Sequence, residues 1–213
     1  MQPTIETLRK AIQEYNSGLA LKTAQEIVDQ KIDPLVAINA MTETIREIGE
    51  AFGQGKLWLP DLVGASDAMQ AALPVLDEEI QRRGEHRDTR GVVIVGAVFG
   101  DIHSIGKTMV AALLTASGFQ VEDLGVNIQS EQFIEAIKSH NADILAMSAL
   151  MTTTIAEQKK VIEVLKETGL REKVKVMVGG AAVTEEFAKD IGADGYDPTA
   201  PGAVELAMKL IGK

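Results

Sequence analysis

Residues 101–103, Asp-Ile-His, hold the side chains whose types and spacing could do metal chemistry in this sequence. A carboxylate two residues from a histidine can hydrogen-bond one imidazole nitrogen and leave the other nitrogen free. That arrangement fixes the tautomer of a metal-binding histidine and raises its basicity. The pair therefore predicts that His103 ligates a metal; the alternative is that His103 is an ordinary polar loop residue.

Few other residues could hold a metal ion. The chain has no cysteine, so disulfides, cysteine-based zinc sites and iron–sulfur clusters are excluded. His86 lies in a polar stretch, and His140 ends an expected helix, where the helix dipole favours a cation. Dispersed histidines argue against a metal cage built by the protein alone. A single ligating histidine favours a metal that arrives inside its own macrocycle.

The sequence partly resembles two nucleotide-binding motifs but matches neither. Gly106-Lys107-Thr108 resembles the end of a phosphate-binding P-loop, but five residues separate Gly100 from Gly106, where the motif requires four. The dinucleotide fingerprint GxGxxG is also missing after the first expected strand. A nucleotide-binding enzyme stays open as an alternative without support from these motifs.

Beyond residue 90, short β-branched runs alternate with amphipathic helices. The expected strands are 92–98, 120–123, 144–147, 174–178 and a weak fifth near 195–196, and the expected helices are 105–117, 130–140, 155–168, 184–191 and 201–211. Alternation at this spacing implies right-handed crossovers and a parallel sheet covered on both faces. We predict an α/β domain with a Rossmann/flavodoxin-like, five-stranded parallel sheet.

The ends of these strands are where a ligand is expected. Ligands of an open parallel sheet bind beyond the carboxyl ends of the strands, where the strand order reverses. Residues 100–106 follow the first strand, residues 148–154 the third, and Gly179-Gly180 the fourth. With the common order 2-1-3-4-5, strands one and three flank the reversal, so their two loops would face each other.

The first part of the chain has a helical period throughout. Asp33-Pro34 is a typical helix start, and an apolar stripe with spacings of three and four residues follows it up to Phe52. A further helix begins near Pro60, and two shorter ones precede residue 33, which predicts a four-helix bundle. Residues 81–90 contain no apolar side chain. We expect a helical cap domain at 1–83, a linker at 84–90 and the α/β domain at 91–213.

Composition narrows the class of partner. The 31 acidic and 21 basic residues give a net charge of -10, which would repel nucleic acid and anionic membrane surfaces. The first residues lack the apolar core of a signal peptide, and no apolar run approaches the ~18–20 residues that span a bilayer. The expectation is a cytoplasmic protein without nucleic-acid or membrane partners.

With these motifs placed, the chain resembles the cobalamin-binding domain of methionine synthase, of B12-dependent mutases and of corrinoid proteins in methyl-transfer systems. The family signature is DxHxxG, then SxL, then GG. Here Asp101 to Gly106 is followed by 41 residues up to Ser148-Ala-Leu150, and by 28 more before Gly179-Gly180. Three motifs in register on the expected strand ends make this resemblance specific.

The resemblance implies that cobalamin (methylcobalamin or a related corrinoid) binds with His103 as the lower axial ligand of cobalt. The displaced nucleotide tail would enter the carboxyl edge of the sheet, where the glycines allow close backbone approach. Thr154 stands where methionine synthase has a serine bonded to the aspartate, which implies a relay from Thr154 through Asp101 to His103 that couples proton uptake to the cobalt state. The implied cofactor-binding residues are Gly100, Asp101, Ile102, His103, Ser104, Ile105, Gly106, Ser148, Leu150, Thr152, Thr154, Gly179, Gly180 and Ala200.

The helical part also carries the resemblance. Residues 51–62 are similar to the segment of methionine synthase whose bundle caps the upper face of the corrin. Carried over by position, Phe52, Leu59 and Leu62 would cover the methyl group. The alternative is plain bundle core, which suits Leu62 better than Phe52.

The implied function is a methyl carrier, a non-catalytic subunit of a methyltransferase system, because nothing beyond the cap and the B12-binding domain is left to bind a substrate. Its partners would be a substrate:corrinoid methyltransferase, a second methyltransferase acting on coenzyme M or tetrahydrofolate, and a reductive activase. Residues 148–154, 179–184 and 192–196 look most like the methylamine group. Carriers for methanol or aryl methyl ethers remain alternatives, as do a mutase small subunit and a B12 sensor.

Overall fold

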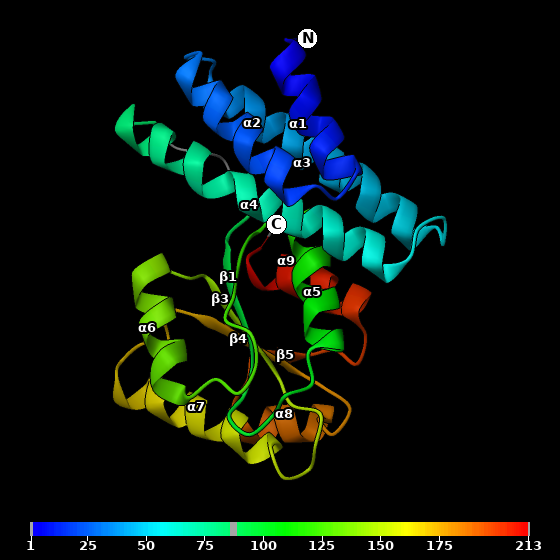
Figure 1. Ribbon diagram of the computed structural model, residues 1–213. Coiled ribbons are helices and arrows are strands. Elements are labelled where there is room, and N and C mark those ends of the chain that lie inside the picture. Colours follow the sequence, from blue (N-terminus) through cyan, green and yellow to red (C-terminus); the bar gives the residue numbers. More distant parts are fainter. Residues whose placement is uncertain (1, 86–88, 213) are drawn as a thin grey trace. The chain divides into compact units, whose positions relative to one another are not determined.

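The chain divides into two compact units in the computed structural model, which describes residues 2–85 and 89–212 (Figure 1). One unit comprises residues 1–88 and 115–118, and the other comprises residues 89–114 and 119–213. The division after residue 88 falls inside the polar stretch 81–90. His86 lies outside the described residues.

The helical unit confirms the expected four-helix bundle. Its helices are α1 (Pro3–Gln13), α2 (Ser17–Asp29), α3 (Pro34–Gly53) and α4 (Leu59–Arg82). The Asp33 side chain accepts a 2.9 Å hydrogen bond from the backbone N–H of Leu35, and proline occupies the first helical position, as the sequence predicts for α3. Asp61 caps α4 by accepting a 2.7 Å bond from the backbone N–H of Trp58.

The second unit is the expected α/β domain. It contains β1 (Val92–Ala97), α5 (Ile105–Ala116), β2 (Gln120–Asp123), α6 (Ser130–His140), β3 (Ile144–Ser148), α7 (Ile155–Glu167), β4 (Lys175–Gly179), α8 (Glu185–Ile191), β5 (Gly195–Tyr196) and α9 (Ala200–Leu210). The strands are parallel, in the order β2-β1-β3-β4-β5, so the predicted order is confirmed. The third and fourth strands end slightly later than predicted, because Ser148 and Gly179 pair with each other as the last rung of the ladder.

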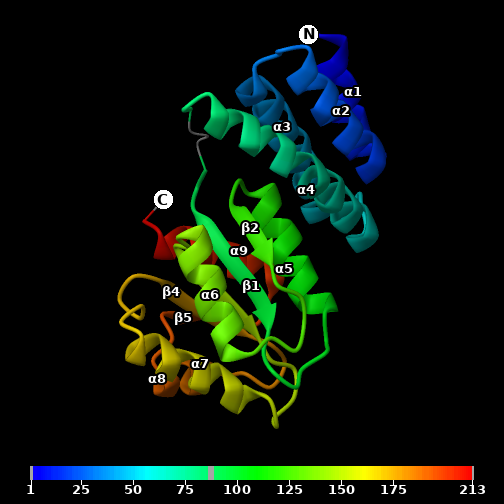
Figure 2. The same cartoon turned by 60° about the vertical axis from the view of Figure 1, so that its left-hand side comes forward.

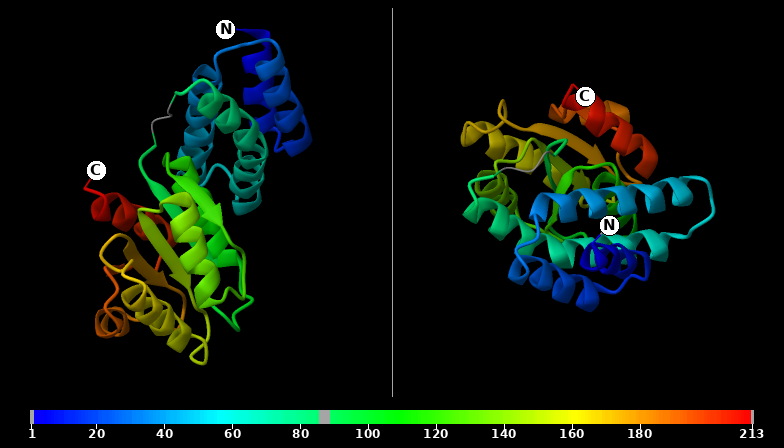
Figure 3. Two further views of the ribbon diagram at one scale, coloured as in Figure 1. Left: turned by 90° about the vertical axis from the view of Figure 1, so that its left-hand side faces the viewer. Right: turned by 90° about the horizontal axis from the view of Figure 1, so that it is seen from above.

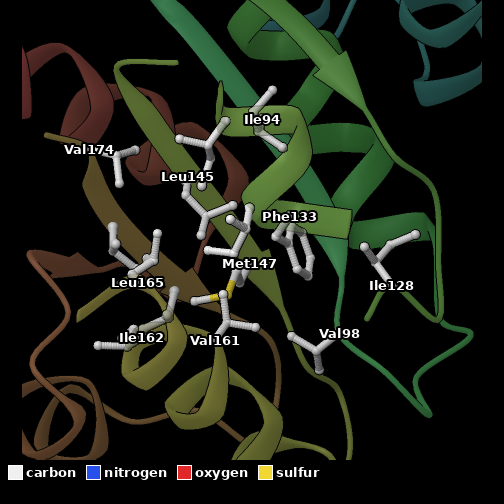
Figure 4. Close-up of a cluster of buried hydrophobic side chains, with 14 of the residues drawn as sticks. Ile94, Val98, Ile128, Phe133, Leu145, Met147, Val161, Ile162, Leu165 and Val174 are labelled. Carbon is white, nitrogen blue, oxygen red and sulfur yellow. The ribbon is translucent and has the colours of Figure 1, made fainter. Parts of the chain in front are cut away.

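Each face of the sheet has its own apolar layer. Side chains alternate along a strand, so Ile94 of β1 packs in one layer while Val93 and Val95 pack in the other. The first layer buries side chains of α6, α7 and α8, with Phe133 fully covered (Figure 4). The second buries side chains of α5 and α9. Figure 2 and the left view of Figure 3 show these helices as ribbons beside the sheet. Both faces are covered, as a parallel sheet requires.

None of the helices in the described ranges is long and apolar enough to cross a bilayer.

Candidate functional site

Asp101 and His103 lie in the loop after β1 and contact each other as predicted. Oδ1 of Asp101 accepts a 2.9 Å hydrogen bond from His103 Nδ1 and a 3.0 Å bond from the His103 backbone N–H. Because an ionised carboxylate can only accept, Nδ1 donates in this bond, and Nε2 is the ring nitrogen left for a metal. The His103 side chain is 44% exposed, so this nitrogen can reach a metal from outside the protein core.

Asp101 is buried, and both of its carboxylate oxygens accept hydrogen bonds. Its side chain is 1% exposed, and Oδ2 accepts hydrogen bonds from the Leu150 backbone N–H at 2.7 Å and from Thr154 Oγ1 at 2.8 Å. Burial by itself would raise the pKa of Asp101, but the hydrogen bonds from His103, Leu150 and Thr154 outweigh it and lower the pKa to about 2. Asp101 is therefore an anion that orients His103 across the neutral pH range.

The three residues expected to form a relay make one hydrogen-bonded chain, from Thr154 through Asp101 to His103. They come together because β1 and β3 are parallel neighbours whose carboxyl ends meet at one edge, with Ala97 paired to Ser148. The loop after β1 thus lies against the loop after β3. The predicted strand order is what makes this meeting possible.

Asn127 also hydrogen-bonds the loop that carries His103, a role that the sequence did not predict. It lies in the β2–α6 loop with a left-handed backbone, φ +59°. Its Oδ1 accepts a 2.8 Å bond from the Gly100 N–H, and its own N–H donates to the Asp101 carbonyl at 2.9 Å. Its position after the second strand, at the same sheet edge, is the sequence signal that could have identified it.

A cavity of about 630 Å³ opens beside His103, on the face of the sheet covered by α5 and α9. Among the predicted residues, the following line it: Ile102, His103, Ser104, Ile105, Gly106, Ser148, Leu150, Gly179, Gly180 and Ala200. Gly100, Asp101, Thr152 and Thr154 do not line it. Asp101 and Thr154 are buried, and Thr152 is exposed in the loop after β3.

Several residues that line this cavity were not predicted. They include Val95, Lys107, Met109, Val110, Ala146, Met177, Asp197, Thr199 and Ala203. The strand alternation could have identified some of them, since Ala146 and Met177 precede Ser148 and Gly179 by two residues and share their face of the sheet.

Gly106 and Gly180 are glycines for different physical reasons. A Cβ built on Gly106 would meet no atom within 4 Å, so this glycine leaves open space that a ligand could fill. A Cβ on Gly180 would lie 2.0 Å from the Ala149 carbonyl oxygen, and φ is +119°. Gly180 is thus required by the packing of the chain itself, whereas the resemblance explained it by the approach of a ligand.

Lys107, the residue that suggested a P-loop, is engaged elsewhere. It is 4% exposed, and its Nζ forms an ion pair with the carboxylate of Asp123 at the end of β2. A P-loop lysine must reach the phosphates of a nucleotide. The ion pair commits this ammonium group to Asp123 instead.

In the helical unit, the three predicted cap residues differ in burial. Leu62 is fully buried in the bundle, while Phe52 and Leu59 are half-buried near the end of α3 and the start of α4. Leu62 is therefore a core residue of the helical unit. Phe52 and Leu59 keep exposed surface for a further contact.

The donor set suits a metal held in a macrocycle. Residues 2–85 and 89–212 contain no group of three or more histidine, cysteine or carboxylate side chains that could hold a metal ion. One imidazole with an oriented tautomer stands at the mouth of a cavity large enough for an organic group. This geometry fits a corrinoid, with His103 as the protein ligand.

Comparison with known proteins agrees with that fit. The B12 binding domain family matches residues 91–205, and a second family, also described as a B12 binding domain, matches residues 4–77. Together the two matches cover most of the helical unit and most of the α/β unit.

Similar proteins match nearly the whole of this chain. Trimethylamine corrinoid protein 2 of Methanosarcina mazei is 42% identical over 210 residues, which is 97% of this chain and 96% of the relative. The structure of the methanol:cobalamin methyltransferase complex MtaBC of Methanosarcina barkeri matches with a TM-score of 0.80 and 30% identity, over 100% of this chain and 81% of that chain. The monomethylamine corrinoid protein of Methanosarcina barkeri matches with a TM-score of 0.56 and 32% identity, over 98% and 99% of the two chains.

Proposed function

This chain belongs to the family of B12-binding corrinoid proteins and binds cobalamin, and from that premise we propose that it carries a methyl group between two methyltransferases. The observation that carries the proposal is the hydrogen-bonded chain from Thr154 through Asp101 to His103, which leaves Nε2 free beside a cavity. A bound corrinoid supplies a cobalt centre that accepts and releases the methyl group.

His103 is the proposed lower ligand of that cobalt, through Nε2. Asp101 holds the proton on Nδ1 and fixes the direction of the ring, as the outer partner of a metal-binding histidine does. The buried carboxylate of Asp101 would also stabilise positive charge on the imidazole ring that it holds. Thr154 in turn donates to the other carboxylate oxygen and keeps Asp101 ionised.

The proposed methyl donor is a methylated amine, delivered by a substrate:corrinoid methyltransferase. Relatives named for trimethylamine and monomethylamine support this choice. The similarity to the methanol complex keeps a methanol carrier as the alternative. The second partner is a methyltransferase acting on coenzyme M or tetrahydrofolate, and a reductive activase completes the set.

Phe52 and Leu59 are the proposed cover of the methyl group, because both retain exposed surface while Leu62 does not. An apolar cover would exclude water from the reacting centre and must move aside for each partner.

The proposal is tested by loading the purified apoprotein with hydroxocobalamin, removing free cofactor and recording the EPR spectrum of the Co(II) form. We expect stoichiometric binding with hyperfine splitting from a histidine nitrogen, lost in His103→Ala and kept in His140→Ala, the exposed histidine at the end of α6. Methyl transfer to and from partner methyltransferases, followed with trimethylamine, monomethylamine and methanol, identifies the donor. Benzimidazole coordination in the wild type would contradict the role of His103.

A further inference from the structure

The cavity has an inner row of side chains that lies across three strands. Val95, Ala146 and Met177 are register partners on β1, β3 and β4, and all three line the cavity. Ser148 and Gly179 pair two residues further along, at the strand ends. Because alternate residues share a face, the inner row lies on the same face of the sheet as Ser148 and Gly179, two residues deeper.

The side chains of this inner row are apolar and almost completely buried. Val95 is 1% exposed, Ala146 6% and Met177 4%. Val110 of α5 and Ala203 of α9 form the walls beside it. The backbone groups of the three strands are used in the sheet ladder, so they offer no hydrogen bonds to a molecule lying over the row.

The polar groups of the cavity lie at its mouth or are already engaged. Thr199 Oγ1 donates to Asp197 Oδ1 at 2.8 Å and accepts from the Gly202 N–H at 3.1 Å, in the loop that leads into α9. Ser148, the half-buried last residue of β3, also lines the cavity. The Lys107 ammonium group, the cation of the lining, is paired with Asp123. The cavity is thus polar at its mouth and apolar at its inner end.

We propose that the inner row makes the cavity selective for corrinoids whose lower base is apolar, a benzimidazole type, over those that carry a purine base. The inference rests on the proposed function, in which His103 takes the place of the base on cobalt and the nucleotide tail enters this cavity. The ribose meets the polar mouth, and the base lies over Val95, Ala146 and Met177. An adenine there buries several ring nitrogens and an amino group without partners, while dimethylbenzimidazole buries a single free ring nitrogen and two methyl groups.

The test compares the binding of three cofactors to the apoprotein by equilibrium dialysis: cobalamin, its counterpart with adenine as lower base, and cobinamide, which has no base. We expect cobalamin to bind about 10- to 100-fold more tightly than the adenine form, the range for a missing hydrogen-bond match in an apolar pocket. Equal affinities of cobalamin and the adenine form would overturn the selectivity, whether or not cobinamide binds more weakly. If none of the three binds, the proposed function itself fails.

Two variants locate the selectivity in the inner row. Met177→Gln keeps the length of the side chain and adds a donor and an acceptor, so we expect the preference for cobalamin to shrink to within about threefold. Met177→Leu is the apolar control and should keep the wild-type ratio. Ala203→Ser adds a hydroxyl at the wall with less change in volume and serves if the glutamine variant does not fold. A wild-type ratio in the folded polar variants would remove the inner row as the cause.

Discussion

Thr154 Oγ1 donates a 2.8 Å hydrogen bond to Oδ2 of Asp101, a residue 53 positions earlier in the chain, while the other oxygen of the same carboxylate holds His103. The carboxylate is almost completely buried, so each of its hydrogen bonds affects both its charge and the direction of the imidazole.

Removing the hydroxyl of Thr154 should therefore raise the pKa of Asp101. In Thr154→Val, Asp101 keeps its backbone donors but loses one bond that lowers its pKa. We expect a carboxyl titration above that of the wild type in the NMR spectrum of the apoprotein, and a loss of about 1.5–3 kcal/mol in stability, as for a hydrogen bond to a charged group. Thr154→Ser should match the wild type. An unchanged titration in the valine variant would show that this bond does not hold the charge of Asp101.

Replacing Asp101 by asparagine should weaken corrinoid binding. The amide is neutral and has only one oxygen. If that oxygen accepts from Leu150 and Thr154, the NH2 group faces the N–H groups of His103, so donor meets donor. Loss of such an outer partner typically costs 10–100-fold in metal affinity, so we expect a Kd for cobalamin about 10–100-fold higher. Wild-type affinity in this variant would mean that His103 needs no orienting partner.

The stability of the apoprotein should depend on pH through Asp101. Its pKa in the folded protein is about 2, below the ordinary value of 3.8, so ionised Asp101 stabilises the fold above pH ~4. That contribution disappears as the pH falls through about 2. The shift corresponds to about 2 kcal/mol. Urea unfolding between pH 5 and pH 2 should show this loss in the wild type and not in Asp101→Asn, whereas parallel pH profiles would contradict it.

Two glycine substitutions should separate the needs of the ligand from those of the fold. Gly106→Ala places a methyl group in the open cavity, in the first turn of helix α5, so the apoprotein should keep its stability while its corrinoid affinity falls. Gly180→Ala drives its methyl group into the Ala149 carbonyl and should cost more than about 2 kcal/mol. Thermal unfolding and binding titrations measure both effects. Full corrinoid affinity in Gly106→Ala would mean that no ligand occupies that space.

The strands and helices of the α/β unit were predictable to within one or two residues. Their signals are local: β-branched runs, amphipathic periods, and loops rich in glycine and small polar residues. The pairing of Asp101 with His103 is local as well, since two residues separate them. The resemblance then supplied the partner Thr154 and the cavity-lining residues at the strand ends, but not the deeper lining residues such as Val95, Ala146 and Met177.

Other features depended on contacts between distant segments, for which the sequence holds no local signal. The bond from Thr154 to Asp101 exists because β3 lies beside β1 in the sheet, and Asn127 reaches the same loop from beyond β2. The clash that requires Gly180 arises from the backbone of Ala149, on a neighbouring strand end.

The sequence by itself thus determined the order of elements, the residues at each strand end and the histidine suited to a cobalt-bearing cofactor. The tertiary structure decided which loops meet, that Leu62 is core while Phe52 keeps exposed surface, and that Val95, Ala146 and Met177 form one apolar row. The physical reason is that periodicity reports which face of an element is buried. Only the packing of strands and helices against one another decides what that face contacts.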